Sequence, residues 1–340
     1  MTISQLLPSI IAVGVAALLS AGIIWAIRPW LLQYALARPN ARSSHRVPTA
    51  QGAGVAVIAA TLLVAGTIAG YAAVPDLSIP PAIFAAALFI AVVGFADDIR
   101  SIPVVPRLLL QGAAVAAVLF TASDDVRISA VCPLWIERGL LLLAGLWFVN
   151  LVNFMDGLDW MTVAEAVPVT GAMVLLGWFG DFPMAATIVA AALCGAMLGF
   201  APFNRPVAKV FLGDVGSLPI GLLLGWCLLQ LAYSQLFAAA LLLPLYYLAD
   251  ATVTLLRRMI RREPFWAAHR SHFYQRATDN GFSVLRVVSE VFALNVGLAV
   301  LAIASTRAQS AVIDVISTTV GGLGVALVMY RFSRRRPATS

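Results

Sequence analysis

Residues 7–27 read LPSIIAVGVAALLSAGIIWAI and contain no charged side chain. As an α-helix, a segment of this length crosses the roughly 30 Å of hydrocarbon in a bilayer. Apolar segments continue after it, so we treat it as a retained span and not as a cleaved signal peptide. The other expected spans cover residues 52–73, 79–96, 107–122, 135–151, 161–180, 184–200, 218–232, 236–256, 287–304 and 311–330.

The composition indicates a membrane protein. The chain has 340 residues, of which 61% are hydrophobic and only 11% are charged. Soluble globular domains carry roughly 25% charged residues, so water is not the main solvent of this chain. We therefore predict an all-α fold class, a polytopic transmembrane helix bundle of about 11 helices. It forms a single integral membrane domain over residues 1–340.

The basic residues predict the orientation in the membrane. All but three of the 22 Lys and Arg residues lie in loops after odd-numbered spans or at the C-terminus. Only Arg127, Arg138 and Arg307 lie on the other side. The positive-inside rule then places the N-terminus in the periplasm and the C-terminus in the cytoplasm. Because this rule accounts for the net charge of +6, we do not expect nucleic-acid binding.

Five aspartates are predicted to meet at the cytoplasmic membrane edge. Asp97 and Asp98 end the third span, Asp156 and Asp159 follow the fifth, and Asp214 precedes the eighth. Carboxylates gathered there repel one another unless a cation or solvent compensates. Oxygen ligands favour Mg²⁺, with Mn²⁺ as an alternative, and the three cysteines lack metal-binding spacing. The alternative is that each aspartate caps a helix in a solvated loop.

Asp250 is an exception, because it lies inside the ninth expected span and the pattern does not explain it. A transporter remains the rival class for a protein of many spans. Its binding groups would lie near the span centres, whereas the other aspartates collect at one face. The distribution of charge therefore favours an enzyme.

The sequence Gly213-Asp-Val-Gly-Ser217 is typical of a helix start, with Ser217 as a candidate N-cap. A helix start also aims free N–H groups at an anion, so capping and phosphate binding are compatible here.

Asn150, Asn153 and Asp156 recur every three positions and are expected to share one helical face. This stripe either leads to the metal site or forms a hydrogen-bonded seam between helices.

Two basic loops could contact phosphate. If the chain is helical after Pro264, then His269, His272 and Arg276 share a face that could hold a diphosphate. The alternative is an amphipathic segment on anionic headgroups. It is equally favoured for the arginines near Arg257 but less so for the histidines.

In the first cytoplasmic loop, Arg42, His45 and Arg46 precede a Gly-rich helix entry. They could contact phosphate or belong to a simple connector.

Five motifs occur in the order PNARSSH (39–45), GFADDIRSIPVVPRLLLQ (94–111), NLVNFMDGLD (150–159), FNRPVAKVFLGDVGS (203–217) and HRSHFYQR (269–276). In this order the chain resembles the polyprenyl-phosphate N-acetylhexosamine-1-phosphate transferases, glycosyltransferase family 4. That family includes the muramoyl-pentapeptide transferase of peptidoglycan synthesis and the enzymes that initiate O-antigen chains.

The resemblance implies residue roles. Asp97 and Asp98 match the pair that acts on the lipid phosphate, and Asp214 matches the principal Mg²⁺ ligand. The remaining matches are Asp156 and Asp159 of the DGxD motif, Asn153, the nucleotide-pocket residues Asn204 and Phe211, and His269 and His272 with Arg270 and Arg276 for the diphosphate charge.

Three departures from the family's motifs indicate which branch of the family the chain resembles. Arg38 stands where many members have Asp, Trp160 replaces the usual second Gly, and Ser271 and Tyr274 interrupt the histidine triplet. The HRSHFYQR form looks more like the O-antigen-initiating enzymes than the muramoyl-pentapeptide transferase.

The reaction implied is transfer of N-acetylhexosamine-1-phosphate from a UDP-N-acetylhexosamine to undecaprenyl phosphate, with release of UMP. It would take place at the cytoplasmic face of the bacterial inner membrane, among membrane lipids. The identity of the sugar, direct transfer against a covalent intermediate, and a homodimer are left open.

Overall fold

The computed structural model describes residues 3–37, 48–71, 77–129, 131–264 and 269–335. Within these ranges the chain forms thirteen helices. They are α1 (Ile3–Tyr34), α2 (Gly54–Tyr71), α3 (Pro81–Ile99), α4 (Val104–Leu119), α5 (Leu134–Met155), α6 (Met161–Phe179), α7 (Met184–Phe200), α8 (Asp214–Tyr233), α9 (Phe237–Leu242), α10 (Leu245–Ile260), α11 (Phe273–Asp279), α12 (Val284–Ala308) and α13 (Ala311–Ser333).

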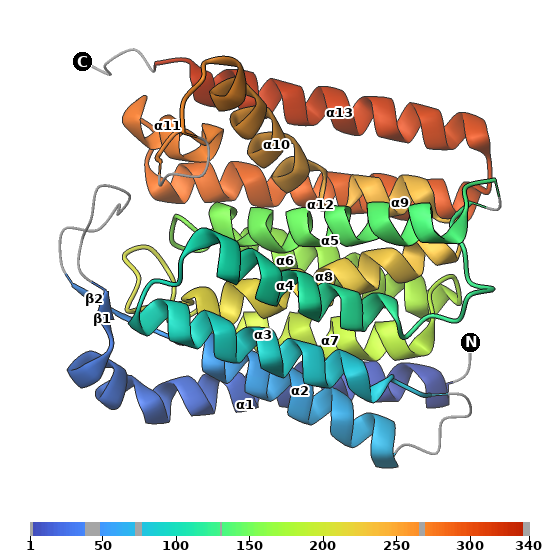
Figure 1. The fold of residues 1–340 in the computed structure, drawn as a ribbon, viewed down its shortest axis with the longest axis horizontal. Coiled ribbons are helices and arrows are strands. Elements are labelled where there is room, and N and C mark those ends of the chain that lie inside the picture. The colour runs from blue at the N-terminus through green and yellow to red at the C-terminus, as the bar shows by residue number, and fades with distance from the viewer. Residues whose placement is uncertain (1–2, 38–47, 72–76, 130, 265–268, 336–340) are drawn as a thin grey trace.

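The helices run alongside one another in a bundle (Figure 1). Seven described helices, α1, α3, α5, α6, α8, α12 and α13, contain segments long and apolar enough to cross a membrane. Apolar segments of α2, α4 and α7 are shorter. The chain is thus an all-α, multi-pass membrane protein, while the count of 11 spans and the orientation remain predictions.

The ninth expected span is not one helix. It is divided into α9 and α10 by Leu243 and Pro244. Proline has no N–H to donate and its ring clashes with the carbonyl four residues earlier, which explains the break. The prediction of a continuous span over residues 236–256 was therefore wrong, and α10 is free to take a direction of its own.

A small three-stranded sheet was not predicted. Strand β2 (Thr49–Gln51) pairs antiparallel with β1 (Leu36–Ala37) and parallel with β3 (Val210–Phe211), with Gln51 opposite Phe211. Strands of two or three residues leave no readable alternation in a sequence. The sheet ties the entry of α2 to the segment that leads into α8.

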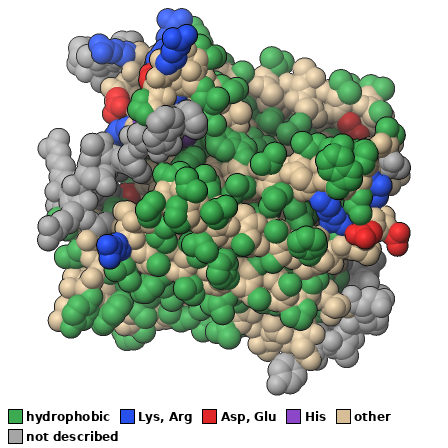
Figure 2. Space-filling model, viewed as in Figure 1, with side chains coloured by type: hydrophobic (Ala, Val, Ile, Leu, Met, Phe, Trp, Pro, Cys, Tyr) green, Lys and Arg blue, Asp and Glu red, His purple; other side chains and the backbone are tan. Residues whose placement is uncertain are grey.

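The centre of the bundle is α8, which packs against α3, α5 and α2. In the spanning windows, 78% of the α8 residues are buried, compared with 22% in α1 and in α13. Hydrophobic side chains cover most of the visible middle of the bundle, and the charged ones lie toward its two ends (Figure 2). This distribution suits a bundle whose middle part is surrounded by lipid.

Two glycines allow α8 to approach its neighbours closely. A Cβ atom at Gly94 of α3 would collide with the backbone carbonyl of Asp214, and one at Gly54 of α2 would collide with the backbone of Gly216. Small residues at such crossings let helix backbones come together in membranes. The close α3–α8 crossing lies beside the aspartates at the end of α3.

We expect Gly94→Ala to destabilise the protein by about 1–3 kcal/mol, because the added methyl group forces α3 away from α8. The measurement is the thermal unfolding midpoint in detergent. Gly112→Ala in α4 is the matched control, since a Cβ there meets nothing within 4 Å and alanine favours a helix. Equal midpoints for the two variants would contradict the close crossing.

Candidate active site

Asp98 joins three separate segments of the chain. Its Oδ1 accepts hydrogen bonds from the Asp214 N–H at 2.9 Å and from Gln51 Nε2 at 2.6 Å, and its Oδ2 accepts the Val215 N–H at 3.0 Å. The carboxylate therefore sits at the start of α8, where the helix dipole favours a negative charge. It connects the end of α3 with strand β2 and α8.

This contact corrects two expectations about the start of α8. The helix begins at Asp214, with Gly213 at the N-cap in the left-handed region (φ 77°), so Ser217 is not the cap. The first two N–H groups of the helix are taken by Asp98 and are not free for a phosphate. Asp214 itself is the helix-start residue that was predicted.

Asp97 lies next to Asp98 but has different partners. Its Oδ1 accepts the Ile102 N–H at 2.5 Å, and its Oδ2 pairs with Arg107 at 2.9 Å. Its carboxyl group also lies beside that of Asp214, and the two interact. The side chain of Asp97 is 6% exposed and that of Arg107 is 23% exposed. Arg107 thus contributes to the site, in addition to its predicted part in membrane orientation.

The polar stripe on α5 divides between two environments. Asn153 Nδ2 donates to Asp214 Oδ1 at 2.8 Å and to Ser217 Oγ at 2.9 Å, which places it in the aspartate cluster. Asn150 instead donates to Gln111 Oε1 of α4 at 2.7 Å. Asn150 thus forms a hydrogen-bonded seam between helices, whereas Asn153 joins the aspartates, and a metal site there remains a prediction. Asp156 lies just beyond the last residue of α5.

The loop between α5 and α6 brings two more carboxylates close to this cluster. Asp156 accepts a hydrogen bond from Thr162 Oγ1, and Asp159 Oδ2 accepts the Ala208 N–H at 3.0 Å. Burial, together with the negative charges of Asp214, Asp98 and Asp159, raises the pKa of Asp156 to about 7. The predicted electrostatic gathering of the aspartates is thus present.

Asn204 connects the α5–α6 loop to strand β3. Its Oδ1 accepts the Trp160 N–H at 2.7 Å, and its Nδ2 donates to the Val210 carbonyl at 2.9 Å. Phe211 follows in strand β3, and its carbonyl accepts the N–H groups of Gly52 and Ala53. The nucleotide-pocket roles of Asn204 and Phe211 remain predictions.

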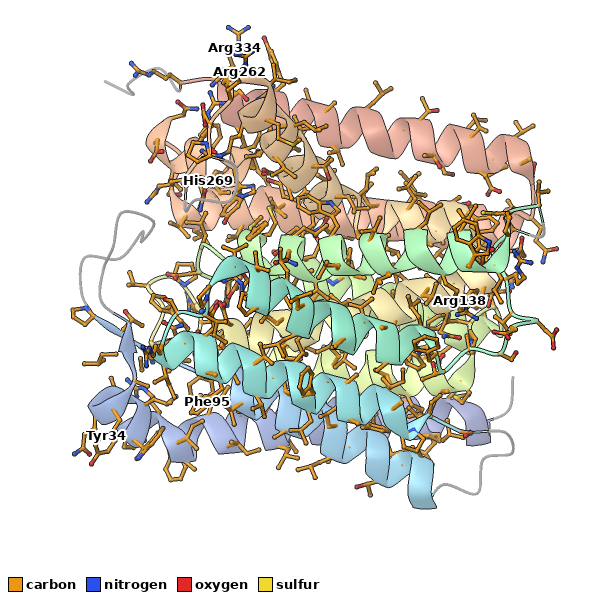
Figure 3. The ribbon with its side chains drawn as sticks, in the orientation of Figure 1. Tyr34, Phe95, Arg138, Arg262, His269 and Arg334 are labelled. Atoms are coloured by element: carbon orange, nitrogen blue, oxygen red, sulfur yellow. The ribbon has the colours of Figure 1, made fainter. Side chains whose placement is uncertain are left out.

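The histidine segment, residues 269–276, lies against the α5–α6 loop. Tyr274 OH donates to the Phe154 carbonyl at 2.9 Å, and a Cβ atom at Gly157 would collide with Tyr274 OH. Figure 3 shows His269 and Phe95 toward one end of the bundle and Arg138 toward the other. Segments that are distant in sequence thus meet at the end where α3 terminates.

His269 and His272 are not on a helix. Helix α11 begins at Phe273, so the predicted helical face that carried both histidines with Arg276 was wrong. The two rings nevertheless lie 4.9 Å apart between centroids. His272 is buried, and its Nδ1 lies 3.2 Å from Asp250 Oδ1. The two rings thus lie close together without a helix to carry both of them.

Nearby arginines differ in their contacts. Arg270 donates to Thr278 Oγ1 at 2.9 Å and lies 3.5 Å from the Asp279 carboxylate. Arg276 is exposed and, with Arg257, Arg258 and Arg261, lines a cavity of about 150 Å³. Arg42, His45 and Arg46 lie outside the described residues.

No group of three or more His, Cys, Asp or Glu side chains in the described part of the chain is spaced to hold a metal ion by itself. Mg²⁺ commonly binds through one or two carboxylates, with phosphates and water as its other ligands. Asp214, in contact with Asp97 and surrounded by further negative charge, suits that kind of ion. The donor set is compatible with Mg²⁺ brought together with a phosphate substrate.

Residues 80–232 match the sequence profile described as Glycosyl transferase family 4. The chain contains a glycosyl transferase family 4 domain. Its limits enclose all five aspartates of the cluster together with Asn153, Asn204 and Phe211, whereas the histidine segment follows it.

Three relatives illustrate the similarity of this chain to curated proteins. It is 40% identical over 87 residues to the phospho-N-acetylmuramoyl-pentapeptide-transferase of Shouchella clausii, covering 26% of each chain. It is 28% identical over 309 residues to the decaprenyl-phosphate N-acetylglucosaminephosphotransferase of Mycobacterium leprae, covering 80% of this chain and 77% of that one.

The third relative is a probable undecaprenyl-phosphate N-acetylglucosaminyl 1-phosphate transferase of Bacillus subtilis, 26% identical over 212 residues and 59% of each chain. The chain spans about a quarter to a half of the length of the muramoyl-pentapeptide transferases that it matches. It spans most of the length of the mycobacterial relative.

Sequence reasoning missed several residues that build the family 4 site. Gln51 and Thr162 carried no signal, because single uncharged polar residues are common in loops and helix starts. Arg107 was visible as a basic residue beside the paired aspartates, but the positive-inside rule already explained it. Asp250 gave a signal that could have been used, since a carboxylate within a span requires a buried partner.

We expect Asp98→Asn to lower the free energy of unfolding by roughly 1–3 kcal/mol, because each Asp98 oxygen accepts a backbone N–H and an amide group would oppose one of them. Asp97→Asn is the matched control. It keeps an acceptor for Ile102, and its partly exposed partner Arg107 can turn to water. Thermal unfolding of both variants tests this, and a larger loss at position 97 would contradict it.

Proposed function

We propose that the chain transfers N-acetylhexosamine-1-phosphate from a UDP-N-acetylhexosamine to undecaprenyl phosphate and releases UMP. The observation that carries the proposal is the gathering of Asp97, Asp98 and Asp214 with Asn153 at one end of the bundle, inside the family 4 domain. The mycobacterial and Bacillus relatives, named for transfer to a polyprenyl phosphate, support the same chemistry.

The reaction requires two anionic phosphates to approach one another, so neutralising and orienting charge is the main catalytic task. We assign the metal position to Asp214, which Asn153 orients through its hydrogen bond to Oδ1. Mg²⁺, or Mn²⁺ in its place, would supply Lewis-acid polarisation of the phosphate oxygens of the UDP-sugar. Burial, together with the surrounding carboxylates, raises the pKa of Asp156, and added positive charge would be favourable beside these carboxylates.

Asp97 is better placed than Asp98 to act on the lipid phosphate. Both oxygens of Asp98 hold the start of α8, and its role is then to keep Asp214 and Asp97 together. Asp97 contacts Asp214 directly, and Arg107 beside it would attract the incoming phosphate. Asp97 would orient the lipid phosphate, whose last proton is weakly held near neutral pH, so a strong base is not needed.

The remaining predicted residues would bind the donor. His269, His272, Arg270 and Arg276 lie on the segment that contacts the α5–α6 loop, from which Asp156 and Asp159 project. Positive or hydrogen-bonding groups there suit a diphosphate. We assign the nucleotide to the neighbourhood of Asn204 and Phe211, and we assign the first-loop residues Arg42, His45 and Arg46 to phosphate contacts.

The cellular setting follows from the distribution of basic residues. We propose that the aspartate end of the bundle faces the cytoplasm of a bacterial inner membrane, where the UDP-sugar is dissolved. The other substrate would enter from the surrounding lipid. The form of the histidine motif favours the initiation of an O-antigen-like polysaccharide as the pathway.

With ³²P in the β-phosphate of the UDP-sugar, we expect the label to enter the lipid fraction as a polyprenyl-diphosphate sugar. Unlabelled UMP should be the co-product, because a phosphate-centred site favours attack at phosphorus. Added UMP should reverse the transfer. If the label stayed in soluble UDP while the sugar alone reached the lipid, the enzyme would be attacking the sugar carbon and the proposed reaction would be wrong.

We expect Asp214→Asn to reduce UMP release by more than about a hundredfold, because a neutral amide cannot supply the charge that holds the cation. The variant should remain folded, since the amide oxygen still accepts the Asn153 hydrogen bond. UMP release is measured against Mg²⁺ concentration. Asp181→Asn, whose partner is Arg307, is the matched control. Normal turnover of the Asp214 variant with unchanged Mg²⁺ dependence would refute the assignment.

A further inference from the structure

Asp250 lies in the middle of α10 and is completely buried. Five donors surround its carboxylate. Oδ1 accepts from the Phe273 N–H at 3.0 Å, His272 Nδ1 at 3.2 Å and Thr254 Oγ1 at 3.3 Å, and Oδ2 accepts from the Tyr274 N–H and Tyr246 OH, both at 3.1 Å. The substrate roles proposed above do not explain why a carboxylate occupies this position.

A buried carboxylate is costly unless hydrogen bonds replace its hydration. In the described part of the chain, His272 is the only ion-pair partner of Asp250. Backbone N–H groups from the start of α11 supply the most direct compensation. Asp250 thus fixes the first turn of α11 against α10, at the point where the chain emerges from the histidine segment.

The same contact fixes the orientation of the His272 ring. A carboxylate only accepts hydrogen bonds, so the proton of a neutral His272 must reside on Nδ1. Neighbouring rings restrict the imidazole further, with centroids at 4.9 Å for His269, 5.7 Å for Tyr274 and 6.5 Å for Phe154. Nε2 is then the nitrogen left for a substrate.

We propose that Asp250 is a positioning residue that holds His272 as the Nδ1–H tautomer, so that Nε2 is available to the UDP-sugar. This inference rests on the proposed transferase function. It explains why a carboxylate occupies a buried position in α10, and it makes the α10–α11 junction part of the active site. Separation of α9 from α10 at Pro244 allows α10 to present Asp250 to that junction.

Asparagine cannot replace this carboxylate. Each oxygen accepts one backbone N–H, so either orientation of an amide places an NH₂ group against a donor. The matched control is Tyr246→Phe, which removes one hydrogen bond to Oδ2, keeps the ring and leaves the contact with His272 untouched.

The first test is a double-mutant cycle on the full chain with Asp250→Asn, His272→Gln and the combined variant. We expect each single change to lower kcat by at least about tenfold with little change in KM, as for loss of a positioned acid or base. The combined variant should be no slower than the slower single variant, because each change alone already disables the Asp250–His272 pair. Tyr246→Phe should stay within about twofold of wild type. Losses that multiply in the combined variant, or a fully active Asp250→Asn, would overturn the proposal.

The second test needs no activity, and the tautomer is measured on the wild-type protein. The chain has only three histidines, so ¹⁵N-imidazole spectra of the wild-type protein are simple, and His272→Gln assigns the His272 signals by their loss. We expect the Nδ1–H tautomer for His272. The Nε2–H tautomer would overturn the inference even if UMP is released. A wild-type protein with the expected tautomer but no UMP release would instead refute the proposed function, and with it the catalytic half of this inference.

Discussion

The hydrogen bonds between the Asp98 carboxylate and the first two N–H groups of α8 are the contact on which the rest of the site depends. They attach the end of α3 to the start of α8, the most buried of the seven long apolar helices, and Gln51 extends the attachment to the small sheet. The glycine at position 94 permits the close crossing that makes this contact geometrically feasible. Through it, Asp97 and Asp214, which are distant in the sequence, become neighbours at the membrane edge.

The α10–α11 junction repeats the same physical solution. Asp250 accepts two backbone N–H groups at the start of α11, as Asp98 does at the start of α8. In both places a carboxylate is stabilised by oriented amide dipoles, and in both it holds another functional side chain in position. One junction organises the proposed cation site and the other organises the histidines, and Tyr274 brings the two together through its hydrogen bond to the Phe154 carbonyl.

Apolar run length predicted the helices well, because burial in lipid imposes a requirement that is local in sequence. The break at Pro244 was missed although its cause, a proline inside an apolar run, is local. The start of α11 was missed because its first N–H groups bind Asp250, which is distant in the chain. Within the site, charge alone predicted that the five aspartates gather, but it could not distinguish Asp98, which accepts backbone amides, from Asp97, which contacts Asp214. Tertiary packing decides which partner a polar side chain bonds to, and this leaves no periodic pattern in the sequence. Asn150 bonds to Gln111, for example, whereas Asn153 bonds to Asp214.

The central claim is that the aspartate cluster holds a divalent cation against the diphosphate of a UDP-sugar. Mn²⁺ is an observable substitute for Mg²⁺, and its electron paramagnetic resonance spectrum reports nearby phosphorus. With UDP-N-acetylhexosamine present, the account predicts one bound Mn²⁺ per chain with hyperfine coupling to ³¹P. A protein that binds no Mn²⁺ in the presence of the UDP-sugar, or that binds it without ³¹P coupling, would contradict the claim.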